Sequence, residues 1–451
     1  MSTLNREEAL ALGQRLCDAS RADETEVTID AQRGSFVRFA DEGPTQSAER
    51  ERVDVSIRVR LGSPESGYRE ARASTGADWE SAQAALASAL ELAEASPVVE
   101  GLAPLGGAAS VPDTHWDEGT LAHDSAEKAR WVQAAVGACQ ERGLQPAGLI
   151  QTGGNERTLV NSVGRAVQGA SNRASLALTA TGATGSGLGH VLRPVVGRLD
   201  PEPAIRVAVE KALAAQAPSD IEPGEYTVIL EPAAVSSLLL FASYNGFGAR
   251  EVEEESSFLC GRLGQRVFPE SVSIVDDAAD PLFPAIPFDG EGTPKARMEL
   301  IERGLCTRPV TDRNYARKRG EESTGHGVMQ PSPSGPKARH LGMGAGDSSL
   351  EELIAGVDDG LLITQFHYTN VIEPRELVLT GMTRNGTYRI QKGELGPAVK
   401  NLRFTQSLVG ALQNVAAVGS QREAVGALFD GESVVPALRI DGFRFTSTTD
   451  F

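Results

Sequence analysis

The chain has 451 residues, 40% of them hydrophobic, and carries a formal net charge of −18. This acidity excludes partners bound through a phosphate backbone, because DNA and RNA binding requires clustered Lys and Arg side chains. No apolar run reaches the length of about 18 residues that a transmembrane helix needs. The first residues lack the basic and apolar regions of a signal peptide, so we expect a cytoplasmic protein without nucleic-acid or membrane partners.

The first part of the chain predicts a helix, an antiparallel sheet and a second helix. Apolar residues alternate with polar ones over 53–61, which predicts a half-buried strand, and 68–74 return as its partner strand. Asp78 is placed to cap a long helix that follows it. We therefore predict an N-terminal α/β domain at residues 1–96.

Residues 97–217 predict a central helix followed by a β-meander. The segment 96–121 is rich in Pro, Gly and Ala, as linkers and long loops are, and a helix follows through Arg142. Strand-like segments separated by Gly turns come next. The stretch GATGSGLGH at 182–190 has neither the GxGxxG nor the GK[ST] spacing of phosphate-binding loops, so we predict a flexible loop.

The polar segment 217–225 predicts a domain boundary, and residues 218–451 predict a β-rich C-terminal domain. From residue 360 onward, short strand patterns alternate with Gly turns. Within this region Asn385-Gly386 is a typical hairpin signal. The predicted fold class is therefore α+β, with an N-terminal helix and antiparallel-sheet region followed by a β-rich C-terminal domain.

The stretch LLLFASYNGFGAREVEEESSF at 238–258 begins as an apolar helix and becomes acidic. A zinc-peptidase helix needs two His residues that bind the metal and a Glu that activates water. This stretch contains no His, and none of the six His residues of the chain is followed by Glu. Consecutive helical carboxylates point in different directions and so do not converge on Ca²⁺ or Mg²⁺. We expect a solvated helix face without a metal.

Other candidate catalytic groups are scattered. There is no GxSxG motif and no CxxC pair, so the four cysteines are expected to be ordinary thiols. The paired carboxylates of Asp276-Asp277 and of the DGE turn at 289–291 suit either loop structure or acid/base chemistry. Three histidines in loops or at strand ends suit either hydrogen bonding or a shared metal, namely His326, His340 and His367. Residue chemistry alone identifies no catalytic constellation.

Several segments of the second half carry a resemblance through their order and spacing. They are FLCGRLGQRV (258–267), SVSIVDD (271–277), PFDGEGT (287–293), RMELIERGL (297–305), NYAR (314–317) and STGH (323–326). Together they resemble the TldD/TldE (PmbA) family of modulator proteins and metallopeptidases. The similarity is collinear from about residue 225 to the C-terminus, and the first half is compatible with it.

The family has two kinds of subunit, and the resemblance implies which kind this chain is. TldD-like chains carry HExxxH on the helix before the first of these segments, and a Cys near the C-terminus completes their zinc site. Here that helix reads Leu240-Phe-Ala-Ser-Tyr-Asn245, and no Cys follows Cys306. The chain therefore resembles the TldE/PmbA side. We expect no catalytic residue, no metal and no cofactor in this chain, with zinc in a TldD-like partner.

The resemblance also implies a mechanism. A TldD-like and a TldE-like subunit form a heterodimer whose cavity binds an unfolded peptide by its backbone, and the partner's zinc activates water. Tyr244, Asn245, His326 and His367 are our candidates for substrate binding. Two alternatives remain open: a stand-alone homodimeric peptide-binding or modulator protein without catalysis, and an altered-site hydrolase of a specialised pathway that uses the loop histidines or paired carboxylates.

Overall fold

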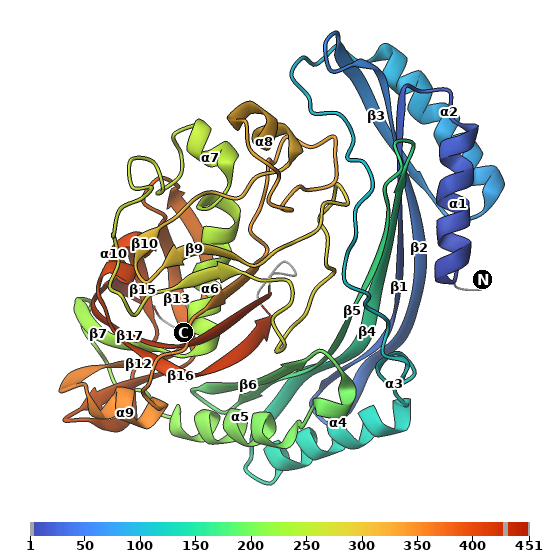
Figure 1. Ribbon diagram of the computed structural model, residues 1–451. Helices are drawn as coiled ribbons and strands as arrows, with labels where there is room; N and C mark the ends of the chain where they lie inside the picture. Colours follow the sequence, from blue (N-terminus) through green and yellow to red (C-terminus); the bar gives the residue numbers. More distant parts are fainter. Residues whose placement is uncertain (1–3, 427–431, 450–451) are drawn as a thin grey trace.

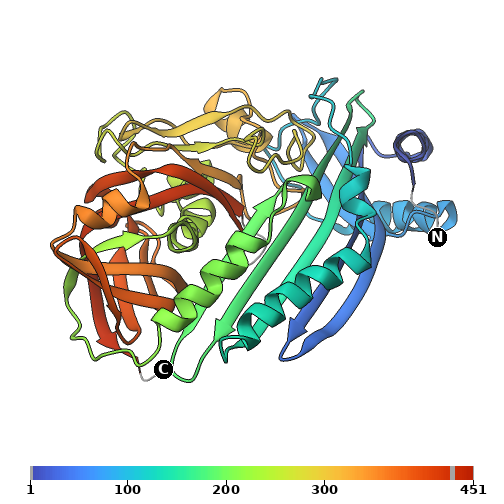
Figure 2. The same ribbon diagram turned by 90° about the horizontal axis from the view of Figure 1, so that it is seen from below.

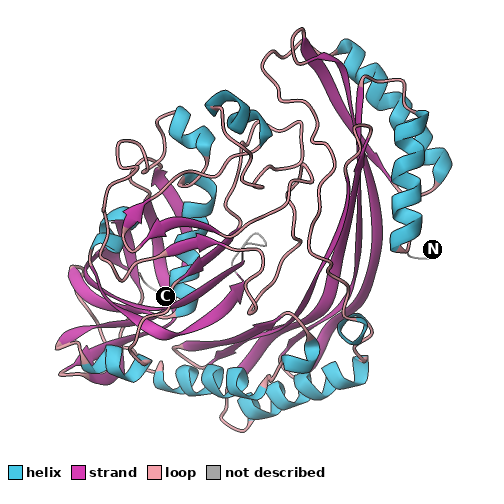
Figure 3. Cartoon of the chain, viewed as in Figure 1, coloured by secondary structure: helices cyan, strands magenta, loops and turns pink. Residues whose placement is uncertain are grey.

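The computed structural model describes residues 4–426 and 432–449, and they form two sheets that face each other across long loops (Figures 1 and 3). The first sheet is antiparallel throughout, with the strand order β3-β2-β1-β4-β5-β6. Its strands are β1 (Glu24–Ala40), β2 (Gly43–Ser63), β3 (Gly67–Thr75), β4 (Gln145–Asn161), β5 (Ala166–Thr181) and β6 (Ser186–Arg193). β1 pairs with both β2 and β4, so the segments 1–96 and 97–217 build one continuous sheet. The division of the chain into three domains stays a prediction.

Helices cover only the outer face of this sheet, and the inner face looks toward the rest of the molecule (Figure 1). The outer helices are α1 (Arg6–Ala19), α2 (Trp79–Ala95), α4 (Ser125–Gln140) and α5 (Glu202–Ala214); α3 (Glu118–Leu121) and a 3₁₀ turn (Val196–Arg198) lie in connections. α1 and α2 pack on β1–β3 through residues such as Leu16 and Leu86. α4 and α5 lie side by side on β4–β6, seen from below in Figure 2, with Val132 and Ile205 buried. This apolar burial leaves the inner face free for polar side chains.

The predicted flexible loop at 182–190 is wrong, because most of it belongs to β6. The alternate glycines Gly187 and Gly189 face α5, where a Cβ atom would run into the backbone oxygens of Ala208 and Ala204. Glycine is required here because the backbones of a helix and a strand approach each other closely. The glycines thus serve packing, a role that the sequence pattern did not separate from loop flexibility.

The second sheet has eleven strands. They are β7 (Glu225–Leu230), β8 (Ile274–Asp276), β9 (Met298–Glu302), β10 (Leu305–Cys306), β11 (His340–Met343), β12 (Asp359–Glu373), β13 (Val378–Gln391), β14 (Glu394–Ala398), β15 (Leu402–Ser407), β16 (Val415–Gly426) and β17 (Glu432–Thr448). The neighbours β7, β12, β13, β15 and β17 form a closed ring, because β17 pairs with both β15 and β7. Contacting aromatic rings of Phe366, Phe404 and Phe443 fill its core. The α+β fold class is confirmed.

The hairpin predicted at Asn385-Gly386 is wrong. Both residues lie inside β13, at the point where its register with β12 shifts between Ile363 and Gln365. Their φ angles are 60° and 122°, so the left-handed backbone that suits a hairpin turn is used for a bulge within a strand.

The helices of the second half are α6 (Pro232–Asn245), α7 (Ala249–Glu253), α8 (Arg313–Arg319), α9 (Leu350–Ala355) and α10 (Leu408–Gln413). The apolar and acidic halves of 238–258 therefore belong to two helices, which separate after α6 at Gly246. Glu253 and Glu254 are exposed, as expected, but Glu251 is buried and pairs with Lys337. None of the described helices is both long and apolar enough to span a membrane.

The segment 96–121, predicted as a linker or long loop, holds the two halves together. It runs between the first sheet and the C-terminal half (Figure 1). On the sheet side, Arg60 donates a hydrogen bond to the carbonyl of Ala103 (2.7 Å). On the other side, Asn314 accepts one from the N–H of Ala103 (2.9 Å), and Arg313 donates to the carbonyl of Pro104. These contacts on both sides position the inner face of the sheet opposite the C-terminal loops.

Candidate functional site

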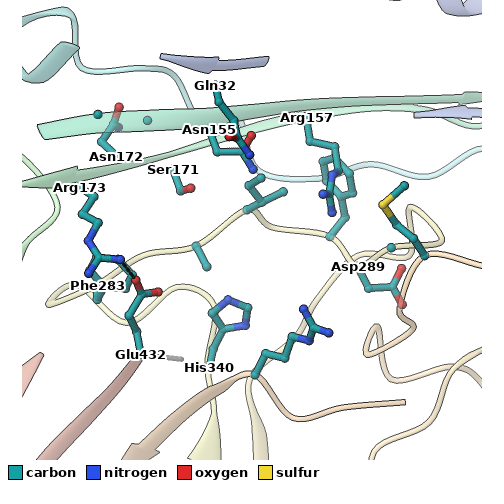
Figure 4. A pocket seen from close by; sticks show the side chains of 18 of the residues that line it. Gln32, Asn155, Arg157, Ser171, Asn172, Arg173, Phe283, Asp289, His340 and Glu432 are labelled. Carbon is teal, nitrogen blue, oxygen red and sulfur yellow. Dashed lines mark hydrogen bonds and ion pairs between the residues drawn. The ribbon is translucent and has the colours of Figure 1, made fainter. Parts of the chain in front are cut away.

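A cavity of about 870 Å³ lies between the inner face of the first sheet and the loops of the C-terminal half (Figure 4). One wall comes from β1, β2, β4 and β5. The other comes from the loops that contain 283–295 and 326–340, together with Glu432 at the start of β17. A volume of this size suits a small molecule or a short stretch of peptide.

The sheet wall presents a row of uncharged polar side chains. Gln32 of β1 is the register partner of Asn155 of β4, which is also the partner of Ser171 of β5. Directly opposite residues project from the same face of a sheet, so the three side chains lie next to one another (Figure 4). The Asn155 Oδ1 atom is buried and accepts no hydrogen bond from any described residue. Such an unpaired acceptor is costly to bury, so a hydrogen-bond donor that reaches it is favoured.

The loop wall is organised around Asp276, the last residue of β8. Its Oδ1 lies 3.1 Å from the Nε2 of His326, and its Oδ2 accepts a hydrogen bond from the backbone N–H of His340 (2.9 Å). Burial alone would raise the pKa of Asp276, but the charges of His326 and then Lys295 hold it well below its usual range. Asp276 is therefore a buried carboxylate that fixes two cavity-lining histidines.

Lys295 completes this group. Its Nζ atom lies 2.9 Å from the Nδ1 of His340. Burial and the charge of Lys295 lower the pKa of His340 to about 3, so its imidazole is neutral and accepts a hydrogen bond from the ammonium group. The Nδ1 of His326 is in turn 2.9 Å from the hydroxyl of Thr324. The resulting cluster has a proton-accepting imidazole and an ammonium group at the cavity wall.

The PFDGEGT turn forms the neighbouring part of the wall through Asp289. Its carboxylate accepts hydrogen bonds from the backbone N–H groups of Glu291 (2.9 Å), Thr293 (2.8 Å) and Gly327 (2.6 Å). Burial raises the pKa of Asp289. Burial and the charge of Asp289 raise the pKa of Glu291 to about 8. Asp289 thus holds the turn against Gly327, whereas the Glu291 carboxyl accepts the backbone N–H of Arg313 (3.0 Å). Of the two only Asp289 lines the cavity.

The structure separates the four predicted substrate-binding residues. His326 lines the cavity, whereas Tyr244, Asn245 and His367 are not among the lining residues. Tyr244 is exposed at the end of α6, Asn245 bonds back to the carbonyl of Phe241, and the ring of His367 packs beside that of Tyr368. Substrate binding by all four stays a prediction.

Sequence reasoning missed other lining residues for an identifiable reason. His340 and the paired carboxylates were candidates without an assigned place. The pair Asp276-Asp277 was identified from its place at the end of the strand pattern SVSIVDD, but its contacts with His326 and His340 could not be predicted. Gln32 and Asn155 carry no local signal, because they meet only through the pairing of strands more than a hundred residues apart.

The residues of α6 do not fit a zinc ion. Ser236, Leu239, Leu240 and Ser243 line a small hollow together with Arg339 and Glu432, and the helix contains no His, Cys, Asp or Glu. The hydroxyl of Ser236 accepts a hydrogen bond from that of Ser433 (2.8 Å), and Ser243 donates one to the carbonyl of Ala338. Hydroxyl groups satisfied by the protein and leucine side chains are not the nitrogen, sulfur or carboxylate ligands that zinc prefers.

Comparison with known proteins identifies the C-terminal half. Residues 223–447 match the PmbA/TldA metallopeptidase C-terminal domain. A metalloprotease of Methanothermobacter thermautotrophicus is 28% identical over 284 residues, 61% of this chain and 62% of that protein. A metalloprotease TldD homolog of Haemophilus influenzae is 28% identical over 251 residues, 53% of this chain and 51% of that protein. The matches thus span about half to three-fifths of the length of these relatives.

The whole chain has the fold of a solved structure, TldE of Thermococcus kodakarensis. The TM-score is 0.84 at 20% sequence identity, and the match covers 98% of this chain and 99% of that one. The structural likeness establishes a common fold, and the domain match ties it to the segments on which the resemblance was based. The chain therefore belongs to the TldD/PmbA family, with the family's C-terminal domain at residues 223–447.

Proposed function

We propose that this chain is the TldE/PmbA-like subunit of a heterodimeric zinc metallopeptidase of the TldD/TldE type, acting in the cytoplasm. Its role is to form part of the cavity that binds unfolded peptides. The catalytic zinc belongs to a TldD-like partner, since α6 offers no zinc ligands at the position of the family's HExxxH motif.

The observation that carries this proposal is the polar row on the sheet wall. Amide and hydroxyl groups at Gln32, Asn155 and Ser171 match the donors and acceptors of a peptide backbone. The Oδ1 of Asn155 has no hydrogen-bond partner among the described residues, so it would accept a hydrogen bond from a peptide N–H that reaches it. Backbone recognition of this kind selects extended chains with little dependence on their side chains.

The assembly is tested by mixing the purified chain with an untagged TldD-like chain that carries HExxxH. We expect a one-to-one complex by size-exclusion chromatography with light scattering, and cleavage of an unfolded peptide only by the complex. Failure to associate at micromolar concentration would count decisively against the heterodimer. A stable homodimer that binds peptide and ignores the TldD-like chain would support the alternative of a stand-alone binding protein.

The peptide-binding wall is tested by Asn155→Leu, with Gln46→Leu on an exposed part of β2 as the matched control. Loss of a hydrogen bond to the peptide should raise the KM of the complex roughly 3- to 10-fold while the complex still assembles. The control should leave KM unchanged. Stoichiometric metal and peptide turnover in this chain alone would favour the altered-site hydrolase and refute the proposal.

A further inference from the structure

The cavity reverses the charge balance of the protein. Seven of its described lining side chains are Lys or Arg and two are Asp or Glu, whereas the whole chain has 43 Lys and Arg against 61 Asp and Glu. Positive charge gathered in a cleft with low-dielectric walls attracts anionic ligands over others.

Several of these cations are neutralised by the protein itself. Arg157 forms a two-pronged pair with Asp30 (2.7 and 2.9 Å). Arg173 pairs with Glu432, Lys337 with Glu251 (2.5 Å) and Arg33 with Glu118 (3.8 Å). Arg50 pairs with no carboxylate of the described residues and is exposed on β2. The two remaining cations of the cavity lining are Lys295 and Arg339.

Lys295 and Arg339 both line the cavity, and Arg339 directly precedes His340, the residue that Lys295 contacts. The hydrogen-bond partner of the Lys295 ammonium is the neutral ring of His340, 2.9 Å away, and not a carboxylate. Both oxygens of the nearby Asp276 are already engaged, one by His326 and one by the His340 N–H. Arg339 makes no hydrogen bond or ion pair with any described residue. Burial lowers the pKa of Lys295, the charges of Asp276 and Asp289 raise it, and the charge of Arg339 lowers it, so the two cations act on each other as well as on these carboxylates.

We propose that Lys295 and Arg339 form a carboxylate-binding site on the loop wall of the cavity. The ammonium is a compact charge and the guanidinium a planar fork, and together they suit a carboxylate through charge-assisted hydrogen bonds. This inference rests on the proposed peptide-binding function and adds a substrate class. The peptides carry an anionic group at this point, either a C-terminal carboxylate or an Asp or Glu side chain.

Three dye-labelled peptides built on one Gly/Ser/Ala sequence distinguish the two possible sources of the carboxylate. The first ends in a free carboxylate, the second in an amide, and the third ends in an amide but has one internal Glu. Fluorescence anisotropy gives Kd for the full chain, alone and with its TldD-like partner. We expect the first or the third peptide to bind about 10-fold or more tightly than the second. The peptide that gains identifies the source of the carboxylate.

Lys295→Gln and Arg339→Gln should each remove most of the difference in Kd between the anionic and the neutral peptides. Arg206→Gln, on the exposed face of α5, is the matched control and should keep the preference. Arg339 is exposed, so its variant provides a test even if Lys295→Gln fails to fold. Equal binding of the three peptides, or a preference that survives both variants, would overturn the carboxylate site but leave peptide binding intact. Absence of binding to any peptide would overturn both proposals.

Discussion

Replacing Glu291 with Gln should remove part of the pH dependence of the stability of this protein. Glu291 is 3% exposed, and burial and Asp289 raise its pKa from 4.5 to about 8. Below pH 4.5 the carboxyl is protonated in both the folded and the unfolded state, so its contribution to stability is complete. As the pH rises toward about 8 the unfolded state loses this proton while the folded state keeps it, and the contribution is lost. Glutamine resembles the protonated form and keeps an oxygen that can accept the N–H of Arg313.

The expected magnitude follows from the size of the pKa difference. Each pH unit between the two pKa values changes the free energy of unfolding by about 1.4 kcal/mol. From pH 5 to pH 7 the native chain should therefore lose up to about 3 kcal/mol relative to Glu291→Gln. Asp289 and Asp312, whose pKa values burial also raises, share the effect and make this an upper limit.

Urea unfolding followed by circular dichroism at pH 5, 6 and 7 measures this difference. The gap between Glu291→Gln and the native chain should widen in favour of the variant as the pH rises. Glu210→Gln, at an exposed position of α5, is the control and should follow the native chain. Parallel curves for Glu291→Gln and the native chain across this range would refute the reasoning, because they would show that Glu291 binds no extra proton in the folded state.

Three other predictions concern packing, a buried ion pair and the cysteines. Gly189→Val should destabilise the protein by about 1–3 kcal/mol, seen in thermal unfolding, because the side chain would push β6 away from α5; an unchanged melting temperature would contradict this. Glu70→Gln should cost about 3–5 kcal/mol in urea unfolding at pH 7, because it leaves the buried Arg58 and Arg60 short of an anion. Since Arg58 and Arg60 lower the pKa of Glu70 despite its burial, that cost should shrink as the pH falls below 4.5, and a cost that stays constant would refute the assignment. In maleimide labelling of the native protein at pH 8, mass spectrometry should find the half-buried Cys260 modified first, and early labelling elsewhere would contradict this. Burial raises the pKa of the other thiols, to about 12 at Cys17 and about 11 at Cys139 and Cys306.

The sequence alone was sufficient for features that depend on neighbouring residues. The alternation of apolar and polar residues over 53–61 lies within β2, although residues 55–60 are buried on both faces and not on one as predicted. Asp78 caps α2 by accepting the N–H of Ser81. The α+β class and the family could also be predicted, since the periodicity of apolar residues and the order of motifs are visible without knowledge of contacts. Where one local pattern serves two structures, as with the glycines of β6 and Asn385-Gly386, the prediction failed because the neighbouring element decides between them.

Only the tertiary structure decided where the cavity lies and which groups meet in it. Gln32 and Asn155 come together through strand pairing, and Asp276, Lys295 and His340 through the packing of β8, β11 and the loops beside them. The low pKa of His340 and the high pKa of Glu291 follow from burial among particular charges. Burial and proximity are properties of the folded chain, and no spacing along the sequence encodes them directly.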